Sequence, residues 1–436
     1  MSTLATTGGK PAFEKPFDHY NSIGQEEIDA VTTVMRSGCL SKFLGAYSED
    51  FYGGPVVRQF EEAWAKRFGI KHAVSVNSAT SALTAAMGAI GIGPGDEVIV
   101  PPYTMSATAI SPIMYGGIPV FADIDADTFC IDPASVRKNI TSKTKAIIAV
   151  NIFGHPAKLK ELRAIADEHN IKLIEDNAQS PLAVENGKLT STIGHIGIFS
   201  LNYHKHIHTG EGGVCVTNDD NLALRMKLIR NHGENVVENL QIEDITNLVG
   251  YNYRLTEIAA AIGLEQLKKI DSHVQIREKV AKIITNGVKG LDGITPPVVR
   301  EGCSHVYYIW AMRFDEKKVG VSRKVFVDAL RAENLPFSAG YVKPLYLLPL
   351  FQQRIATGRD GFPFSLSDRR YDKGLCPVVE RMHFEELVAF VLCNYELTEA
   401  MAEKIAATIR KVYDNRHELK ALSQSDKAAV TSGASK

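Results

Sequence analysis

The sequence predicts an α/β protein, in which a large domain with a mostly parallel sheet flanked by helices precedes a smaller α+β domain. From residue 57 to about residue 175, short apolar segments alternate with helical segments. This alternation is typical of strands joined by helical crossovers, and such strands pair in parallel. After about residue 269 both strands and helices become sparser, which favours an α+β arrangement for the second part.

The expected elements of the large domain follow one another in alternation. Helices are expected where apolar residues recur at helical spacing and glycine follows, as Gly69 follows residues 57–68. Strands are expected at short apolar runs such as EVIV at 97–100, which ends at Pro101. In chain order, the expected helices cover 57–68, 81–90, 104–115, 132–140 and 159–169, and the expected strands cover 72–76, 97–100, 119–122, 145–150 and 172–175.

The C-terminal part is expected to hold helices at 274–288, 322–333 and 397–415 and an alternating strand at 306–314. The ends of the chain are small and polar, which predicts disorder over residues 1–10 and in the tail. The predicted division is therefore a flexible N-terminus at 1–16, a large domain at 17–272, a small domain at 273–420 and a disordered tail at 421–436.

Composition excludes several classes of protein. The 49 Lys and Arg residues balance 50 Asp and Glu residues, which argues against a nucleic-acid binder with a basic surface. The hydrophobic fraction of 45% argues against a disordered chain. We find no signal-peptide core and no run of the roughly 18 apolar residues that a membrane helix needs. Six scattered cysteines without CxxC spacing indicate free thiols, so the predicted location is the cytoplasm, away from membranes.

The first segment with chemical potential is Asn77-Ser78-Ala79-Thr80, between a predicted strand and an Ala-rich helix. A helix N-terminus offers unpaired N–H groups and the positive end of a dipole, and the hydroxyls of Ser78 and Thr80 add hydrogen-bond donors for a phosphate. The alternative interpretation is a simple N-cap by one of these hydroxyls.

The second segment is Glu175-Asp176-Asn177-Ala178-Gln179, directly after the apolar strand KLIE. Residues beyond the carboxyl ends of parallel strands line the ligand crevice of such folds. A carboxylate there can pair with a protonated ring nitrogen, although a turn or cap carboxylate is the alternative.

The third segment runs from Phe199 to Gly213 and places Lys205 between histidines, ahead of a glycine-rich turn. This pattern suits an amine that forms a Schiff base close to a backbone that approaches a ligand. A metal site is the alternative, because His204, His206 and His208 would share one face of a strand. No cysteine or carboxylate cluster completes such a site, so no metal is expected. A solvated polar loop is the remaining interpretation.

Together these segments resemble the fold-type-I pyridoxal-phosphate enzymes and, more narrowly, the sugar aminotransferases of the DegT/DnrJ/StrS family. The resemblance covers residues 24 to 413. It rests on the order and spacing of GDEVIVPPYT (95–104), IEDNAQ (174–179), FSLNYHKHIHTGEGGVCVT (199–217), RNHG (230–233) and GYNYRLTEIAAA (250–261). The resemblance implies a large domain with a seven-stranded type of sheet and pyridoxal 5'-phosphate as the cofactor.

The resemblance also implies roles for single residues. Lys205, six residues before Glu211 in a K-x5-E-G-G pattern, would form the Schiff base. Asp176 would hold the pyridine nitrogen protonated, and Gln179 would lie near the ring oxygen. Ser78, Ala79, Thr80 and Ser200 would surround the phosphate, and Met105 stands where the family usually has an aromatic residue that stacks on the ring. Asn252 would reach the phosphate of a neighbouring subunit, which makes a homodimer with shared active sites part of the expectation.

The implied activity is transfer of an amino group from glutamate, or glutamine, to a keto group on a sugar-like acceptor in amino-sugar biosynthesis. A nucleotide-linked ketosugar is the favoured acceptor. Residues of the second half that could line its site are His305, Tyr307, Lys343, Tyr346 and His383. Two alternatives are a deoxysugar dehydratase, in which histidine tends to replace the lysine, and a non-catalytic protein that senses a small molecule.

Overall fold

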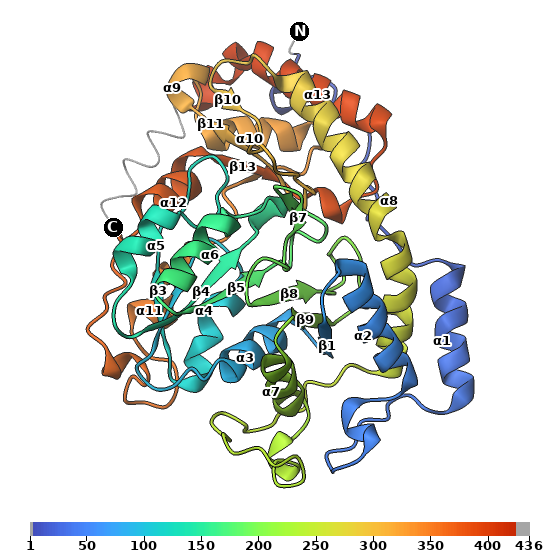
Figure 1. Ribbon diagram of the computed structural model, residues 1–436. Helices are drawn as coiled ribbons and strands as arrows, with labels where there is room; N and C mark the ends of the chain where they lie inside the picture. The colour runs from blue at the N-terminus through green and yellow to red at the C-terminus, as the bar shows by residue number, and fades with distance from the viewer. Residues whose placement is uncertain (1–2, 424–436) are drawn as a thin grey trace.

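The computed structural model describes residues 3–423 and contains one large sheet of seven strands (Figure 1). Its strand order is β1 (His72–Val76), β9 (Gly213–Thr217), β8 (Ile196–Ser200), β5 (Lys172–Asp176), β4 (Thr144–Val150), β2 (Glu97–Val100) and β3 (Ile118–Phe121). Only β9 runs antiparallel to its neighbours, whereas β8, β5, β4, β2 and β3 pair in parallel. The predicted α/β class with a mostly parallel sheet is therefore confirmed.

Helices cover both faces of this sheet, because its strands are apolar on both sides. Figure 1 shows α5 and α6 on one side and α3 and α7 on the other. The helices up to this point of the chain are α1 (Gln25–Ser37), α2 (Pro55–Phe68), α3 (Ala79–Ala89), α4 (Ala107–Ile110), α5 (Pro133–Asn139), α6 (Leu159–Glu168) and α7 (Asp220–Arg230). A small hairpin, β6 (Val184–Glu185) and β7 (Lys188–Leu189), lies between β5 and β8.

The helix expected at 104–115 is wrong in its extent. The structure has only the short α4 and a separate 3-10 turn at Pro112–Tyr115. Pro112 has no N–H to donate to the preceding turn, so the α-helix ends before it.

The second part of the chain surrounds a smaller antiparallel sheet. Its order is β10 (Ile294–Thr295), β11 (Trp310–Phe314), β13 (Leu387–Phe390) and β12 (Ser338–Ala339). The strand expected at 306–314 thus begins only at Trp310. The helices of this part are α9 (Glu316–Val319), α10 (Arg323–Ala332), α11 (Pro349–Gln352), α12 (Pro377–Arg381) and α13 (Glu399–Asp414).

Helix α8 (Glu257–Val288) connects the two parts as one continuous helix of 32 residues. The sequence predicts a helix at 274–288 and a separate amphipathic stretch at 256–270, but not one continuous helix. The domain boundary expected at 272/273 falls inside this helix, so the helix belongs to both parts, and the division stays a prediction. None of the helices among residues 3–423 is long and apolar enough to cross a membrane.

The described N-terminal residues pack against the small domain, which differs from the flexible segment expected at 1–16. Leu4 is fully buried and Phe13 nearly so. The buried Glu333 carboxylate accepts hydrogen bonds from the backbone N–H groups of Ala5 (3.0 Å) and Ala12 (2.7 Å). The side chains of Leu4 and Phe13 and the Glu333 carboxylate hold this segment in place. The polar composition of the segment gives no sign of these contacts. Of the disordered tail predicted at 421–436, residues 424–436 lie outside the described residues.

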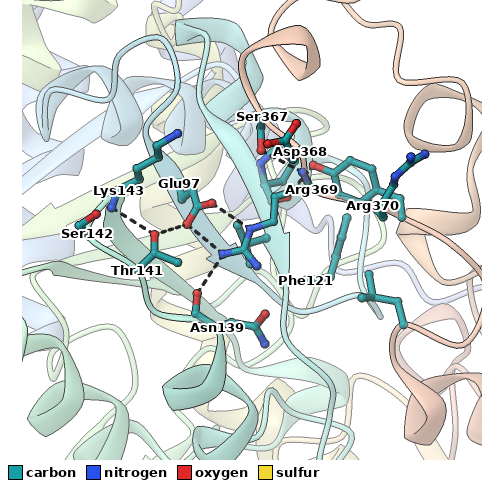
Figure 2. A pocket seen from close by; sticks show the side chains of 14 residues that line it. Glu97, Phe121, Asn139, Thr141, Ser142, Lys143, Ser367, Asp368, Arg369 and Arg370 are labelled. Atoms are coloured by element: carbon teal, nitrogen blue, oxygen red, sulfur yellow. Dashed lines mark hydrogen bonds and ion pairs between the residues drawn. The ribbon is translucent and has the colours of Figure 1, made fainter.

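A surface cleft of about 580 Å³ lies along the edge strand β3 and at the amino ends of β2 and β4 (Figure 2). Its central contact joins Glu97, the first residue of β2, to Arg369, whose Nε and Nη2 donate to the carboxylate at 2.9 and 3.1 Å. Thr141 Oγ1 donates to the same carboxylate at 2.6 Å. These bonds fasten the segment around Arg369 to the edge of the sheet, while Arg370 and Lys143 extend away from the ion pair (Figure 2).

Candidate active site

The residues singled out in the sequence lie at the carboxyl ends of the strands, opposite to this cleft. Asp176 is the last residue of β5 and Ser200 the last residue of β8, and helix α3 begins at Ala79 after β1. Lys205 lies in the turn that follows β8. The carboxyl ends of parallel strands and the N-terminus of a helix thus meet at one place, which is where ligands bind in open α/β sheets.

Lys205 lies in a setting that favours a neutral amine. Its Nζ lies 4.6 Å from the ring centroid of Tyr308. The residue is partly exposed, but protein atoms surround the amine. This desolvation lowers the pKa of Lys205 to about 8, although the nearby Asp176 and Cys393 act in the opposite direction. An amine with such a pKa is far more nucleophilic near neutral pH than an ordinary lysine.

Asp176 is a buried carboxylate with two hydrogen bonds and, among residues 3–423, no cation at ion-pair distance. Thr108 Oγ1 donates to Oδ2 at 2.9 Å, and the backbone N–H of Ala178 donates to Oδ1 at 3.2 Å. Burial raises the pKa of Asp176, and these two bonds and the charge of Lys205 only partly oppose it. A cationic partner would relieve this desolvation cost.

The N-terminus of α3 has the geometry of an anion site. Ser78 Oγ accepts a hydrogen bond from Ser81 N at 3.0 Å, so this hydroxyl caps the helix. By helix geometry, the N–H groups of Ala79 and Thr80 have no partner within α3. Gly213 permits the close approach of this turn, because a Cβ at Gly213 would lie 2.5 Å from the carbonyl carbon of Ser78. Ser200 Oγ lies on the adjacent strand end and accepts from Asn202 N at 3.4 Å.

Gln179 is buried behind Asp176, with both ends of its side-chain amide engaged. Its Oε1 accepts from the backbone N–H of Phe153 at 2.8 Å, and its Nε2 donates to the hydroxyl of Tyr341 at 3.1 Å. Gln179 therefore lies at the same edge of the sheet as Asp176, held in a fixed orientation.

Asn252 is exposed and lies beside the Asn77–Thr80 turn of its own chain. Asn77 Nδ2 donates to the backbone oxygen of Asn252 at 3.4 Å, and Asn77 N donates to the oxygen of Tyr253 at 2.9 Å. The expected contact of Asn252 with a neighbouring subunit stays a prediction. The same holds for Met105, whose side chain is 63% exposed.

The five candidate substrate residues fall into three groups. His383 Nδ1 lies 3.2 Å from the hydroxyl of the buried Tyr103. Burial lowers the pKa of His383, and the charges of Arg323 and of the exposed Lys343 add to this effect. His305 and Tyr307 stack on each other with ring centroids 3.9 Å apart. The suggestion for Tyr346 is not supported, because Tyr346 is fully buried, packs on Phe121 and donates its hydroxyl to Glu380. These contacts give Tyr346 a structural role.

The three alternating histidines of the lysine turn have separate surroundings. His206 is fully buried and its Nε2–H donates to the backbone oxygen of Val306 at 2.8 Å, whereas the ring of His204 lies against Tyr203. The turn forms no strand, so the imidazoles share no face. Within residues 3–423 no group of three or more His, Cys, Asp or Glu side chains is arranged to hold a metal ion.

Three residues of the site escaped the sequence reasoning: Thr108, Tyr308 and Tyr341. Each comes from a segment without a motif, and each reaches the site through the tertiary fold. Tyr308 follows the His305–Tyr307 pair that the sequence had marked, so the neighbouring aromatic residues were its only signal.

The residues present fit pyridoxal 5'-phosphate. A desolvated amine at Lys205 could bind it covalently, the unpaired carboxylate of Asp176 could face its ring nitrogen, and the open end of α3 could accept its phosphate. Gly213 contributes to this arrangement, because the absence of a Cβ lets the turn at Ser78 lie close to the start of β9.

Comparisons with known proteins agree with this fit. A family model described as the DegT/DnrJ/EryC1/StrS aminotransferase family matches residues 21–389. The chain is 38% identical over 299 residues to GDP-perosamine synthase of Caulobacter vibrioides, covering 68% of this chain and 78% of the relative. It is 32% identical over 434 residues to L-glutamine:2-deoxy-scyllo-inosose aminotransferase of Streptoalloteichus tenebrarius, covering 96% of this chain and 99% of the relative.

Two solved structures are also similar. The structure of DesI in the presence of its TDP-sugar product has a TM-score of 0.79 at 25% identity, covering 96% of this chain and 98% of that chain. A GDP-4-keto-6-deoxymannose-3-dehydratase has a TM-score of 0.73 at 26% identity, covering 90% and 99%.

Proposed function

Since the chain belongs to the DegT/DnrJ/EryC1/StrS aminotransferase family and is a pyridoxal-phosphate-dependent aminotransferase, we propose that it aminates a keto group of a sugar-like acceptor. The amino donor is glutamate or glutamine. The observation that supports this proposal best is the intact lysine site, in which the Lys205 amine with its lowered pKa lies close to the buried Asp176 carboxylate.

Each site residue has a part in this proposal. Lys205 binds the cofactor covalently and, once released, moves a proton at the amino-bearing carbon, because an amine with a pKa of about 8 can both accept and return it near neutral pH. Asp176 keeps the ring nitrogen protonated. Gln179 lies beside the ring oxygen, and Ser78, Ala79, Thr80 and Ser200 hold the phosphate. The cofactor, when bound, supplies the electron sink.

We favour a nucleotide-linked ketosugar as the acceptor, in amino-sugar biosynthesis. The similarity to GDP-perosamine synthase and to DesI with its TDP-sugar product supports this acceptor. The relative aligned over almost the whole chain is named for a cyclic ketone, 2-deoxy-scyllo-inosose, and for glutamine as donor, so both classes of ketone belong in the test. His383, Lys343, His305 and Tyr307 are the proposed lining residues. A cytoplasmic location stays a prediction.

The dehydratase alternative is kept because one similar structure is a dehydratase. The presence of Lys205 in its expected register favours transamination, because an aminotransferase needs the amine to bind and release the cofactor.

The test incubates the purified holoenzyme with glutamate or glutamine and follows the visible absorption of the cofactor. Each donor is then combined with a panel of nucleotide-linked ketosugars and cyclic ketones, and the products are identified by mass spectrometry. We expect loss of the visible band with one donor and a product in which an amino group replaces a keto oxygen. A product that has lost water without gaining nitrogen would identify a dehydratase, and absence of any change with either donor would favour the sensing protein.

We also propose a homodimer in which Asn252 of each chain completes the phosphate site of the other. The exposed side chain of Asn252, which is accessible to a partner, supports this proposal, and the backbone of Asn252 lies beside the Asn77–Thr80 turn of its own chain. In a two-fold dimer such an arrangement occurs twice. The stretch at 256–270 is apolar at more positions than a single buried helix face needs. Helices α1 and α2 contact it, but Ile258, Ile262 and Leu264 stay partly exposed and are available to a partner.

Subunit exchange tests the shared site. Lys205→Ala and Asn252→Ala variants, each inactive alone, are mixed and allowed to exchange subunits. A shared site predicts recovered activity, because the mixed dimer keeps one site with Lys205 from one chain and Asn252 from the other. No recovery after proven exchange would mean that Asn252 serves the phosphate site of its own chain.

A further inference from the structure

The segment after β12 in the small domain is docked onto the carboxyl-end edge of the large sheet. Tyr341 N donates to the hydroxyl of Tyr103 at 2.9 Å, and Leu345 N donates to the backbone oxygen of Pro102 at 2.8 Å. Pro102 and Tyr103 directly follow β2. Residues 341–345 therefore lie where the large domain ends its strands, although they are more than 200 residues away in sequence.

Tyr341 lies inside this junction with its ring fixed by aromatic neighbours. Its ring centroid is 5.9 Å from that of Tyr103 and 5.2 Å from that of Phe153, both in edge-on contact. Its hydroxyl accepts the hydrogen bond from Gln179 Nε2. Because the ring cannot turn without losing these contacts, the hydroxyl has one position.

This hydroxyl determines how the Gln179 amide is oriented. A carboxamide has one oxygen and two N–H donors. The backbone N–H of Phe153 holds the oxygen, and Tyr341 takes one donor. A flip of the amide would bring its NH₂ group against the N–H of Phe153, so the second N–H has a single direction.

We propose that Tyr341 is a positioning residue of the cofactor site, which holds the Gln179 amide so that its second N–H donates to the cofactor's ring oxygen. This inference rests on the proposed function, because it takes Gln179 to lie beside that oxygen. Through Tyr341 and Gln179, the docked segment of the small domain influences the electronic state of the bound cofactor. Asp176 raises the pKa of Tyr341 together with the larger effect of burial, so the phenol remains protonated while it accepts from Gln179.

The test uses the holoenzyme and a matched pair of variants. Tyr341→Phe removes the hydroxyl and keeps the ring and the backbone bond to Tyr103. Tyr371→Phe is the control, because the Tyr371 hydroxyl is buried and donates one hydrogen bond, to the oxygen of Pro119 at 2.9 Å, in the cleft at the amino ends of the strands. The readouts are the pH dependence of the cofactor's absorption spectrum and the concentration of free cofactor that half-saturates the protein.

For Tyr341→Phe we expect a shifted spectral titration and roughly tenfold weaker cofactor retention, the size expected when a buried donor loses its acceptor. Tyr371→Phe should leave both readouts unchanged while lowering the melting temperature. A wild-type spectrum in Tyr341→Phe, or the same spectral shift in Tyr371→Phe, would overturn the proposal.

A double-mutant cycle separates action through Gln179 from a general loosening of the site. In a Gln179→Ala background, adding Tyr341→Phe should have no further effect on the spectrum or on retention, because the group that it positions is gone. Additive effects would overturn the proposal. None of these readouts needs an acceptor sugar, so a failure to aminate any ketosugar would count against the proposed function and leave this inference intact.

Discussion

Buried carboxylates have opposite surroundings at the amino ends and at the carboxyl ends of the strands of the large sheet. At the amino ends of the strands, burial alone would raise the pKa of Glu97, but the hydrogen bonds from Arg369 and Thr141 bring it below its usual range. At the carboxyl ends, Asp176 is buried with only a threonine and a backbone N–H as partners, and its pKa is raised. A carboxylate with a cationic partner, such as Glu97 with Arg369, stabilises the structure. A buried carboxylate without a cationic partner, such as Asp176, is suited to bind a cationic group of a ligand.

The lysines at the two ends of the strands also have different surroundings. Lys143 lies exposed at the rim of the amino-end cleft, whereas Lys205 at the carboxyl ends has a pKa of about 8 because it is desolvated. We therefore expect substitutions at one edge to change catalysis and substitutions at the other to change only stability.

The largest effect is expected for Lys205→Ala. In the proposed mechanism the Lys205 amine both attaches the cofactor and moves the proton, and the latter alone contributes roughly 10²–10⁴-fold. Turnover of the donor should fall below detection in a stopped-flow absorbance assay. Lys143→Ala is the matched control and should be as active as the wild type. Measurable turnover in Lys205→Ala would place the covalent bond elsewhere.

Asp176→Asn should follow in size. This change keeps the shape and removes the charge that we propose holds the ring nitrogen protonated, so we expect a loss of about 3 kcal/mol in transition-state stabilisation. The measurement is kcat/KM for the amino donor. The variant should fold with a melting temperature no lower than that of the wild type, because an unpaired buried carboxylate is removed. Near-normal turnover would show that Asp176 is only a turn carboxylate.

Glu97→Gln should show the reverse pattern. Losing the charge of a hydrogen-bonded ion pair at the amino ends should lower the free energy of unfolding by about 2 kcal/mol, with kcat/KM unchanged. The folded-state pKa of Glu97 is lowered, so its contribution is present above the pKa of the unfolded state and is lost as the pH falls through the folded-state value. Urea unfolding at pH 7 and at acid pH measures both effects. A loss of activity without a loss of stability would contradict the distinction between the edges.

The subtlest effect concerns the pH dependence of the cofactor-free protein. The folded-state pKa of Lys205, about 8, lies below its ordinary value of 10.5. Between these values the unfolded chain binds the additional proton, so this residue makes stability rise with pH in that window. The rate of cofactor capture should increase as the amine loses its proton and level off above pH 8. Capture that continues to rise steeply up to pH 10 would mean that the amine is not desolvated.

Much of this site could be read from the sequence, because its residues lie next to elements with strong local signals. Asp176 follows an apolar strand, and Thr80 and Lys205 adjoin a helix start and a glycine-rich turn. Most strands of the large sheet were predictable because each contains a short run of apolar residues.

Other features of the fold and the site depend on contacts between segments far apart in sequence, and these could not be predicted from the sequence. Tyr341 reaches Gln179 only because residues 341–345 dock after β2, and Tyr346, a few residues later, turns into the core instead. The helix expected at 274–288 extends back to Glu257 because its first half is covered by α1 and α2. The N-terminal segment gains its order from Glu333, which is far away in sequence.

We propose that the protein holds its cofactor on Lys205, at the carboxyl ends of the strands. Borohydride reduction of the holoenzyme, followed by proteolysis and mass spectrometry of the peptides, measures where the cofactor is attached. We expect a single pyridoxyl adduct, on the peptide that contains Lys205. An adduct on another lysine, or a protein that binds the cofactor but forms no adduct, would contradict it.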